Sequence, residues 1–414
     1  MAAIPDRLVI QPYTVEVETA ESLVVRGVVL DRSYQLTPDF LLFLKYFEQP
    51  AGREEFLREQ AGSYDRAELE AGLDHLCGVG LLVPAQHVDL MRSVQFAPPL
   101  APPFGFEKGD IIGFLQAEQP PAAVVVGFPY DGATTAGSGA RSGPESIRYC
   151  APVRPASERI ADLASGEVLN SFLGAAIDLG DLRPRPGESA ESYGSRIEAV
   201  AAAVAARGSM LIGLGGDHSI TYPLIKGLQR GRAERGAPGE LGLLHFDAHT
   251  DFPQADNFHQ LHGRHTHGTF VRNVVDDGLA TALIQVGVRG LVPGSEAGRS
   301  SRLARSHLVI GAHEAAALDC AAFVGRIPAG LPYYLTVDID VLDPAFAPDT
   351  GTPVPGGLSS QRLTELLGWI AQERELAGID LTEVAGSPCR ANRTAAAAAD
   401  ALEHCLVRVL ARRG

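Results

Sequence analysis

The 414-residue chain is poor in cysteine and in basic residues, and each shortage excludes a class of protein. Five Cys spread over this length do not form a disulfide framework, which favours a reducing compartment, the cytoplasm. Lys and Arg total 35 against 50 Asp and Glu, for a net charge of −15. That balance argues against general attraction to nucleic acid or to anionic lipid.

The sequence also lacks long hydrophobic runs. No apolar stretch reaches the ~18 residues that suggest a membrane span, and the opening MAAIPDRLVIQPY does not have the pattern of a secretory signal. The apolar fraction of 45% is nevertheless that of an ordinary globular protein. We therefore expect a folded protein with neither a nucleic acid nor a membrane as its partner.

A proline-rich segment predicts where the chain divides. Residues 96–104, FAPPLAPPF, contain four Pro, which favour a stiff, extended connector. We expect a small N-terminal domain over residues 1–95, a linker over residues 96–104 and a catalytic domain over residues 105–414.

The segment before the linker has the pattern of a small α+β module. YTVEVET and LVVRGVVL are rich in Val and predict strands. DFLLFLKYF and REEFLREQ predict helices, and Asp65 can cap a third helix in which Leu69, Leu73 and Leu76 recur at helical spacing. With LLVP as a closing strand, this order of elements predicts a winged-helix-like domain.

The segment after the linker alternates apolar runs with helical segments. Continuous apolar strands separated by helices predict an α/β fold with a parallel sheet that is covered on both faces. Ligands of such sheets bind at the carboxyl ends of the strands. The eight strand candidates are AAVVVGFPYD, LGAAIDLGD, SMLIGLGGD, LGLLHFDAHTD, ALIQVGVRG, HLVIGA, YYLTVDID and AGIDLTE.

Polar side chains gather at the ends of three of these strands, in GGDHS, DAHTD and DID. Residues two apart in a strand point the same way, so each motif can present its side chains together. A single Asp or His at such a place is usually a helix cap or a turn residue, but six at three strand ends indicate a shared site. Carboxylates this close would raise each other's pKa unless cations balanced them. The candidate ligands are His218, Asp247, His249, Asp251, Asp338 and Asp340.

The chemistry of this donor set narrows the choice of metal. Carboxylate oxygens with some imidazole suit Mn²⁺, and the absence of Cys from the set argues against structural zinc. Two cations about 3.5–4 Å apart can hold one water and convert it to hydroxide near neutral pH.

The three motifs together resemble the signatures of the ureohydrolases, the family of arginase and agmatinase. GGDHS, DAHTD and DIDVLDPAFAPDTGTPVPGGLS carry the likeness, and GFPYDGATTAGSGARSGPESIR over residues 127–148 resembles the family's opening strand and loop. The resemblance extends from about residue 120 to the end of the chain. It implies a three-layer α/β/α domain around an eight-stranded parallel sheet, two Mn²⁺ ions on the six candidate ligands, and hydrolysis of a guanidino group to urea and an amine.

The resemblance also implies roles for three side chains. Asp251 matches the residue that relays a proton from the nucleophile to the leaving nitrogen. Glu383 matches the acid that binds the planar guanidinium through paired hydrogen bonds, although the family usually continues with Asn-Pro where this chain has residues 385–388, AGSP. His267 matches an active-site His that binds substrate and shuttles protons. The nearby His259, His262 and His265 leave open a separate metal patch or a polar loop.

The N-terminal domain resembles the winged-helix peptide-recognition domains of enzymes that modify ribosomally made peptides. Such domains bind a leader peptide as an added strand. Residues 1–100 carry 8 Lys and Arg against 15 Asp and Glu, which argues against DNA binding, whereas a structural or oligomerisation role stays open. We expect the substrate to be an arginine residue of a precursor peptide, converted to ornithine, and the enzyme to be a homo-oligomer. The alternatives are a free guanidino compound such as arginine or agmatine, a metal-dependent deacetylase, and an inactive binding scaffold.

Overall fold

The fold was analysed in a computed structural model of the chain. The residues that it describes are 5–19, 21–99, 101–152, 160–161, 168–169, 175–252, 263–291, 306–389 and 391–412. They divide into two units, each of which is described by itself. The first unit consists of Met1–Pro98 and Gly109–Pro120, and the second of Pro99–Lys108 and Pro121–Gly414.

The first unit combines short helices with two antiparallel sheets of three strands each. One sheet has the order β5 (Ala51–Gly52), β1 (Arg7–Ile10), β6 (Leu82–Pro84), and the other β2 (Tyr13–Glu18), β3 (Leu23–Gly27), β4 (Arg32–Leu36). The helices are α1 (Phe40–Tyr46), α2 (Arg53–Gln60), α3 (Arg66–Gly78), α4 (Val88–Ser93) and α5 (Ile111–Gln116). A further short strand, β7 (Phe96–Ala97), begins where the Phe96 N–H donates to the Val29 carbonyl at 2.7 Å.

The core of the first unit follows the expected pattern. Asp65 caps α3 by accepting the Ala67 N–H at 3.1 Å, and Leu69, Leu73 and Leu76 are buried on one face of the helix. The strands and helices predicted from the sequence are confirmed, but the strands β1, β4 and β5 and the helices α4 and α5 were missed. β4, with the sequence RSYQL, has four polar or aromatic residues that are not fully buried, so it carries no continuous apolar signal.

The second unit is built on the eight strands that the sequence predicted, and each of these strands is parallel to its neighbours among the eight. Their order is β16 (His307–Ile310), β15 (Ala282–Val286), β14 (Gly242–Phe246), β17 (Tyr333–Asp338), β18 (Leu376–Thr382), β13 (Met210–Gly215), β9 (Ala123–Phe128), β12 (Ala176–Leu182). A short strand β8 (Glu107–Lys108) pairs with β12, and β10 (Ile160–Ala161) pairs with β11 (Val168–Leu169).

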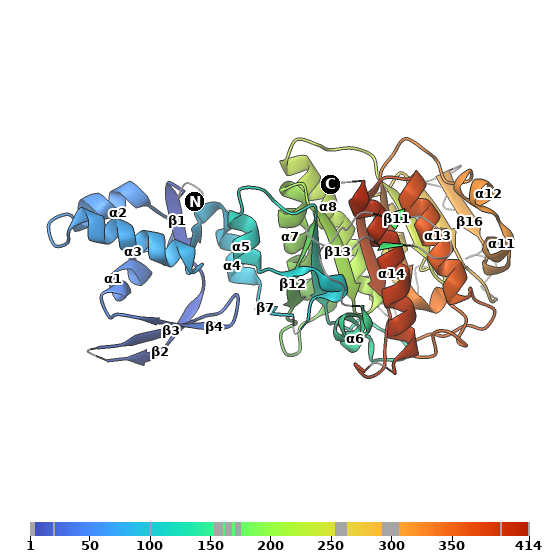
Figure 1. Ribbon diagram of the computed structural model, residues 1–414, viewed down its shortest axis with the longest axis horizontal. Coiled ribbons are helices and arrows are strands. Elements are labelled where there is room, and N and C mark those ends of the chain that lie inside the picture. Colours follow the sequence, from blue (N-terminus) through green and yellow to red (C-terminus); the bar gives the residue numbers. More distant parts are fainter. Residues whose placement is uncertain are drawn as a thin grey trace. The chain divides into compact units, whose positions relative to one another are not determined.

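Helices cover both faces of this sheet, as the burial of its strands requires. β9, β13, β14, β15 and β17 are buried at every residue. α7 packs with α8, while α14 packs with α13 and with α6, which gives the predicted α/β/α layers (Figure 1). The helices are α6 (Gly143–Cys150), α7 (Ala190–Ala206), α8 (Thr221–Glu234), α10 (Phe270–Asp276), α11 (Ala312–Ala317), α12 (Cys320–Val324), α13 (Ser360–Glu373) and α14 (Arg393–Ala411).

A buried ion cluster joins α6 to β12. The Arg148 guanidinium donates to Asp178 at 2.8 and 2.9 Å and to Asp181 at 2.5 Å. Burial opposes the charge, but the two carboxylates raise the pKa of Arg148 above its usual value. The cluster therefore fixes the first helix of the unit against the sheet.

Two further findings concern the chain as a whole. None of the five cysteines, all of which are described, forms a disulfide. Within the described ranges, no helix has both the length and the apolar character that crossing a bilayer would need.

Candidate metal centre

The candidate site lies at the carboxyl ends of four adjacent strands, β14, β17, β18 and β13. Asp247 follows β14, Asp338 ends β17, Glu383 follows β18 and His218 follows β13. Parallel neighbours end at the same edge, so four segments that are far apart in sequence meet there. The sheet order therefore explains why these side chains converge.

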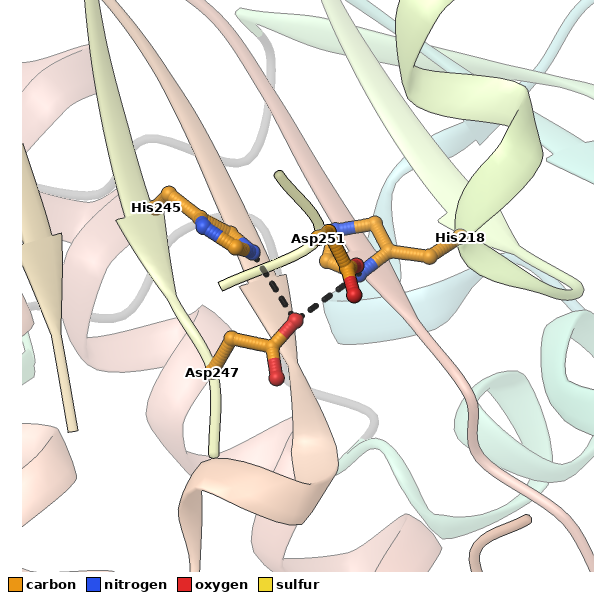
Figure 2. A group of neighbouring side chains, drawn as sticks. All are labelled: His218, His245, Asp247 and Asp251. Carbon is orange, nitrogen blue, oxygen red and sulfur yellow. Dashed lines mark hydrogen bonds and ion pairs between the residues drawn. The ribbon is translucent and has the colours of Figure 1, made fainter. Parts of the chain in front are cut away.

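One group of donors surrounds His218. Its Nδ1 lies 3.3 Å from Asp247 Oδ2, 3.5 Å from Asp251 Oδ2 and 3.2 Å from Asp338 Oδ2. Figure 2 shows the imidazole of His218 and the carboxylates of Asp247 and Asp251 pointing toward one another. Nδ1 is buried and has no hydrogen-bond partner within the described ranges. A buried, unsatisfied nitrogen beside carboxylates fits a metal ligand.

The far side of the His218 ring explains why Nδ1 is free. The Thr336 hydroxyl donates to Asp380 at 2.5 Å, so its oxygen accepts from His218 Nε2 at 2.8 Å. With the ring proton on Nε2, the lone pair of Nδ1 points at the carboxylates. Partners of this kind set the tautomer of metal-binding histidines.

A second group of donors surrounds His249. Its Nδ1 lies 3.3 Å from Asp247 Oδ1 and 3.1 Å from Asp340 Oδ2. Asp247 thus faces both groups, with Oδ2 toward His218 and Oδ1 toward His249. The structure brings together all six residues that the sequence singled out as ligands.

The electrostatics of the two groups favour cations. Burial, and then the charge of Asp247, raises the pKa of Asp251 well above its usual value. Burial, and then the charge of Asp340, does the same for Asp338. Crowded carboxylates with imidazoles and no thiolate fit divalent cations that prefer oxygen and nitrogen ligands.

His245 is a site residue that the sequence analysis missed. It lies on β14 two residues before Asp247, and its Nε2 is 2.8 Å from Asp247 Oδ2 (Figure 2). The two-residue spacing was a signal that both side chains face the same way. Burial lowers the pKa of His245, which favours a neutral ring.

Glu383 has one fixed oxygen and one free oxygen. Its Oε1 accepts from the His218 N–H at 3.0 Å and from His267 Nδ1 at 3.1 Å. Its Oε2 is buried without a partner among the described residues. A carboxylate oxygen held in this way can accept from a cationic donor that enters the site.

His267 lies in a turn (His267–Thr269) before α10 and is tied at both ring nitrogens. Its Nε2 accepts the Thr135 N–H at 3.0 Å, which leaves the proton on Nδ1, toward Glu383. Burial alone would lower the pKa of His267, but the hydrogen bond and charge of Glu383 raise it. His265 lies elsewhere, with its ring 6.0 Å from that of Tyr222, and His259 and His262 lie outside the described residues.

A cavity of about 400 Å³ opens over these groups, lined by His249, Asp251, His267 and Asp338 among others. Arg289 is the one permanently charged cation among its described lining residues. Its Nη2 donates to the carbonyls of Asp340 and Val354, both at 2.6 Å, and its other nitrogens bind further backbone carbonyls. This guanidinium is therefore engaged by the protein itself.

The fold and the site together define a class: an α/β enzyme whose strand ends can hold divalent cations beside a free carboxylate oxygen. Residues 121–407 match the Arginase family, and the chain belongs to that family. It is a ureohydrolase, of the class that hydrolyses guanidino C–N bonds, and the family uses a binuclear metal centre. A deacetylase is thereby excluded.

Two curated relatives are similar over most of their length. A guanidinopropionase of Pseudomonas aeruginosa is 33% identical over 278 residues, which cover 65% of this chain and 82% of that protein. An agmatinase of Neisseria meningitidis is 36% identical over 299 residues, which cover 72% of this chain and 89% of that protein.

Solved structures show the same architecture. A hypothetical agmatinase from Burkholderia thailandensis aligns with a TM-score of 0.59 at 32% identity, covering 77% of this chain and 94% of that one. A proclavaminate amidino hydrolase from Streptomyces clavuligerus aligns with a TM-score of 0.58 at 28% identity, covering 72% of this chain and 96% of that one. Nearly all of each relative is thus matched, while a quarter or so of this chain is additional to it.

Proposed function

We propose that the chain is a Mn²⁺-dependent hydrolase that converts an arginine residue of a precursor peptide to an ornithine residue and urea. The free Oε2 of Glu383, beside a carboxylate cluster suited to two cations, is the observation that carries the guanidino chemistry. The peptide substrate is the finer part of the proposal and rests on separate observations.

The proposed metal ligands are the six side chains in the two donor groups. When bound, two Mn²⁺ ions supply an activated water and stabilise the negative charge that develops on the substrate. Manganese is proposed because the donors are oxygen and imidazole. The six residues are His218, Asp247, His249, Asp251, Asp338 and Asp340.

The protein's own residues have three tasks in this reaction. Glu383 Oε2 accepts from the planar guanidinium and orients its carbon toward the cluster. The oxygen of the attacking water bonds to the guanidinium carbon, and Asp251 takes a proton from this water and passes it to the alkyl-bearing nitrogen. The C–N bond to that nitrogen breaks, so that urea and an amine leave. His267, with its proton on Nδ1, exchanges protons between the site and the cavity.

The cavity lining supports a substrate without a free α-carboxylate. Arg289 is the only permanent cation in the described lining, and backbone carbonyls occupy its donors. No described lining group therefore offers an ion pair to a free α-carboxylate. An arginine residue in amide linkage has no such group to satisfy.

The first unit supports a peptide partner. The family match begins at residue 121, so Met1–Pro98 is additional to the catalytic unit. β2 is an edge strand whose Val15 and Val17 are 44% and 45% exposed. An exposed apolar edge can pair with an incoming strand. We propose that residues 1–95 bind a leader peptide in this way.

Agmatine is a second candidate substrate. It lacks a carboxylate, so the argument from Arg289 fits it equally, and one relative described above is an agmatinase. The first unit would then have a structural role.

Cellular location and assembly are further parts of the proposal. The five cysteines form no disulfide, which supports the cytoplasm. We also propose a homo-oligomer, which light scattering on the purified full chain would test.

Urea release from the Mn²⁺-loaded full chain tests the proposal. The substrates are an arginine-containing peptide with its leader, the same peptide without a leader, agmatine and free arginine. We expect most urea from the leader-bearing peptide, with a raised KM in the variant Val15→Lys/Val17→Lys. Val309→Lys on β16, at a residue that is 39% exposed in the second unit, is the matched control. Urea from agmatine or arginine alone refutes the peptide substrate, and no urea from any substrate refutes the guanidino chemistry.

A further inference from the structure

We infer that Gln285 is a positioning residue for the metal centre: through His245 it holds Asp247 in the orientation that serves both donor groups. The inference deepens the proposed function and rests on its metal site. The side-chain hydrogen bonds of Gln285 go to His245, to the Thr250 carbonyl and to His307.

The sheet register places Gln285 beside His245. Gln285 lies on β15 and His245 on β14, and the two residues are paired directly across the parallel strands. Both side chains are buried, with exposed fractions of 1% and 0%. A buried amide must satisfy its donors and its acceptor within the protein, so its partners are informative.

Those partners fix the orientation of the amide. Gln285 Nε2 lies 2.7 Å from the carbonyl oxygen of Thr250, which can only accept a hydrogen bond. The atom facing Thr250 is therefore the nitrogen and not the oxygen. The contact of the amide oxygen supports the same orientation, because Oε1 accepts from His307 Nε2 at 3.0 Å.

The orientation of the amide fixes the tautomer of His245. The second hydrogen of Gln285 Nε2 points to His245 Nδ1 at 2.9 Å, so Nδ1 accepts and carries no proton. The ring proton of neutral His245 is then on Nε2, which donates to Asp247 Oδ2 at 2.8 Å. Both ring nitrogens are engaged, so His245 supports a ligand instead of being one, although it lies within ligand distance of the cluster.

The consequence falls on Asp247 and on the loop after it. Asp247 is the carboxylate that faces both donor groups, and its Oδ1 also accepts the His249 N–H at 2.5 Å. The same Gln285 amide holds the carbonyl of Thr250, which lies between His249 and Asp251 in the chain. One side chain on a neighbouring strand thus orients three of the proposed ligands.

The substitution Gln285→Glu tests this role with little change of shape. Glu cannot donate to Thr250 or to His245, and it draws the ring proton of His245 onto Nδ1. The lone pair of Nε2 then faces Asp247 Oδ2 and repels it. We expect Mn²⁺ affinity, measured by calorimetric titration, to fall about 10–100-fold. Gln229→Glu is the matched control, since Gln229 donates to the Leu279 carbonyl at 3.0 Å away from the site.

Two further readouts separate positioning from a general structural effect. Nitrogen-15 NMR of the metal-free wild type should place the His245 proton on Nε2, and Gln285→Glu should move it to Nδ1. In a His245→Phe background, Gln285→Glu should lower Mn²⁺ affinity by a smaller factor than in the wild type, because the route to Asp247 is already cut and only the contact with the Thr250 carbonyl remains to be lost.

The outcomes that would overturn the inference are distinct from those that test the reaction. A proton on His245 Nδ1 in the wild type refutes it, as does unchanged Mn²⁺ affinity in a folded Gln285→Glu or Gln285→Met variant. If Gln285→Glu lowers Mn²⁺ affinity in the His245→Phe background by the same factor as in the wild type, the route through His245 is refuted. The proposed function fails separately, if the wild type neither binds Mn²⁺ nor releases urea.

Discussion

Replacing Glu383 by Gln keeps the shape of the side chain and removes its charge. Oε1 accepts from the His218 N–H and His267 Nδ1, and Oε2 is free for the substrate. The new amide nitrogen must take one of these two places, where it opposes either two protein donors or the guanidinium. Truncating one partner of a buried charge pair costs about 3–5 kcal/mol. We therefore expect kcat/KM for urea release to fall about 10²–10⁴-fold.

The same substitution should not destabilise the fold. In the free enzyme Glu383 is 1% exposed, and its Oε2 has no hydrogen-bond partner among the described residues. A buried charge with an unsatisfied oxygen destabilises the fold, and the neutral Gln side chain removes that charge. The free energy of unfolding in urea, measured without metal, should stay equal or rise. Glu365→Gln on α13, where Glu365 pairs with Arg362 at 2.8 Å, is the control and should leave kcat/KM unchanged. The reasoning is refuted if Glu383→Gln keeps kcat/KM within threefold, or if it loses activity and stability together.

Three other perturbations have expected outcomes. Removing Mn²⁺ with a chelator should lower Tm. A ligand that binds only the folded state adds about 2.7 kcal/mol per site to the free energy of unfolding when its concentration is 100 times Kd. An unchanged Tm by calorimetry contradicts the metal centre. Arg148→Met leaves the carboxylates of Asp178 and Asp181 without their cation. The free energy of unfolding in urea should fall by about 3–5 kcal/mol, and a fall below ~1 kcal/mol contradicts the role given to that cluster. Backbone N–H groups, first that of Ala345, lower the pKa of Asp343. The ionised Asp343 carboxylate therefore raises the free energy of unfolding relative to the Asp343→Asn variant. This difference should be full above pH ~4 and should disappear as the pH falls through the lowered pKa. A difference between the two proteins that grows on acidification contradicts the prediction.

The strands of the second unit could be predicted because each is a continuous apolar run that ends in Gly or Asp. Parallel neighbours end at one edge, so the motifs with His218, Asp247 and Asp338 were expected at the same edge once the sheet was assumed. Sequence spacing therefore indicated which strand ends carry the donors, whereas their convergence depends on the strand order, which places β14, β17, β18 and β13 side by side. His245 obeyed the same spacing rule, but a histidine inside an apolar run was interpreted as part of the strand.

Other features depend on contacts that the sequence does not encode locally. The role of Gln285 needs the register of β15 against β14, and 40 residues separate it from His245. The two oxygens of Glu383 differ only because His218 and His267 approach one of them from separate segments. In the first unit, β4 was missed because its local signal is weak and it is held as a strand by pairing with β3.

Backbone strain adds an independent argument for the site. Four described non-glycine residues have left-handed backbone, and two of them, Asp251 and Glu383, are side chains of this centre, with φ of 46° and 61°. Such conformations cost of order 1–3 kcal/mol each and persist where the surroundings impose them. At Glu383 the imposing contact is its own N–H, which donates to the Gly216 carbonyl at 2.9 Å and so ties the end of β18 to the loop that carries His218. The turn that strains the backbone is thus the one that aims the carboxylate at the donor groups, and a relaxed backbone there would point it elsewhere.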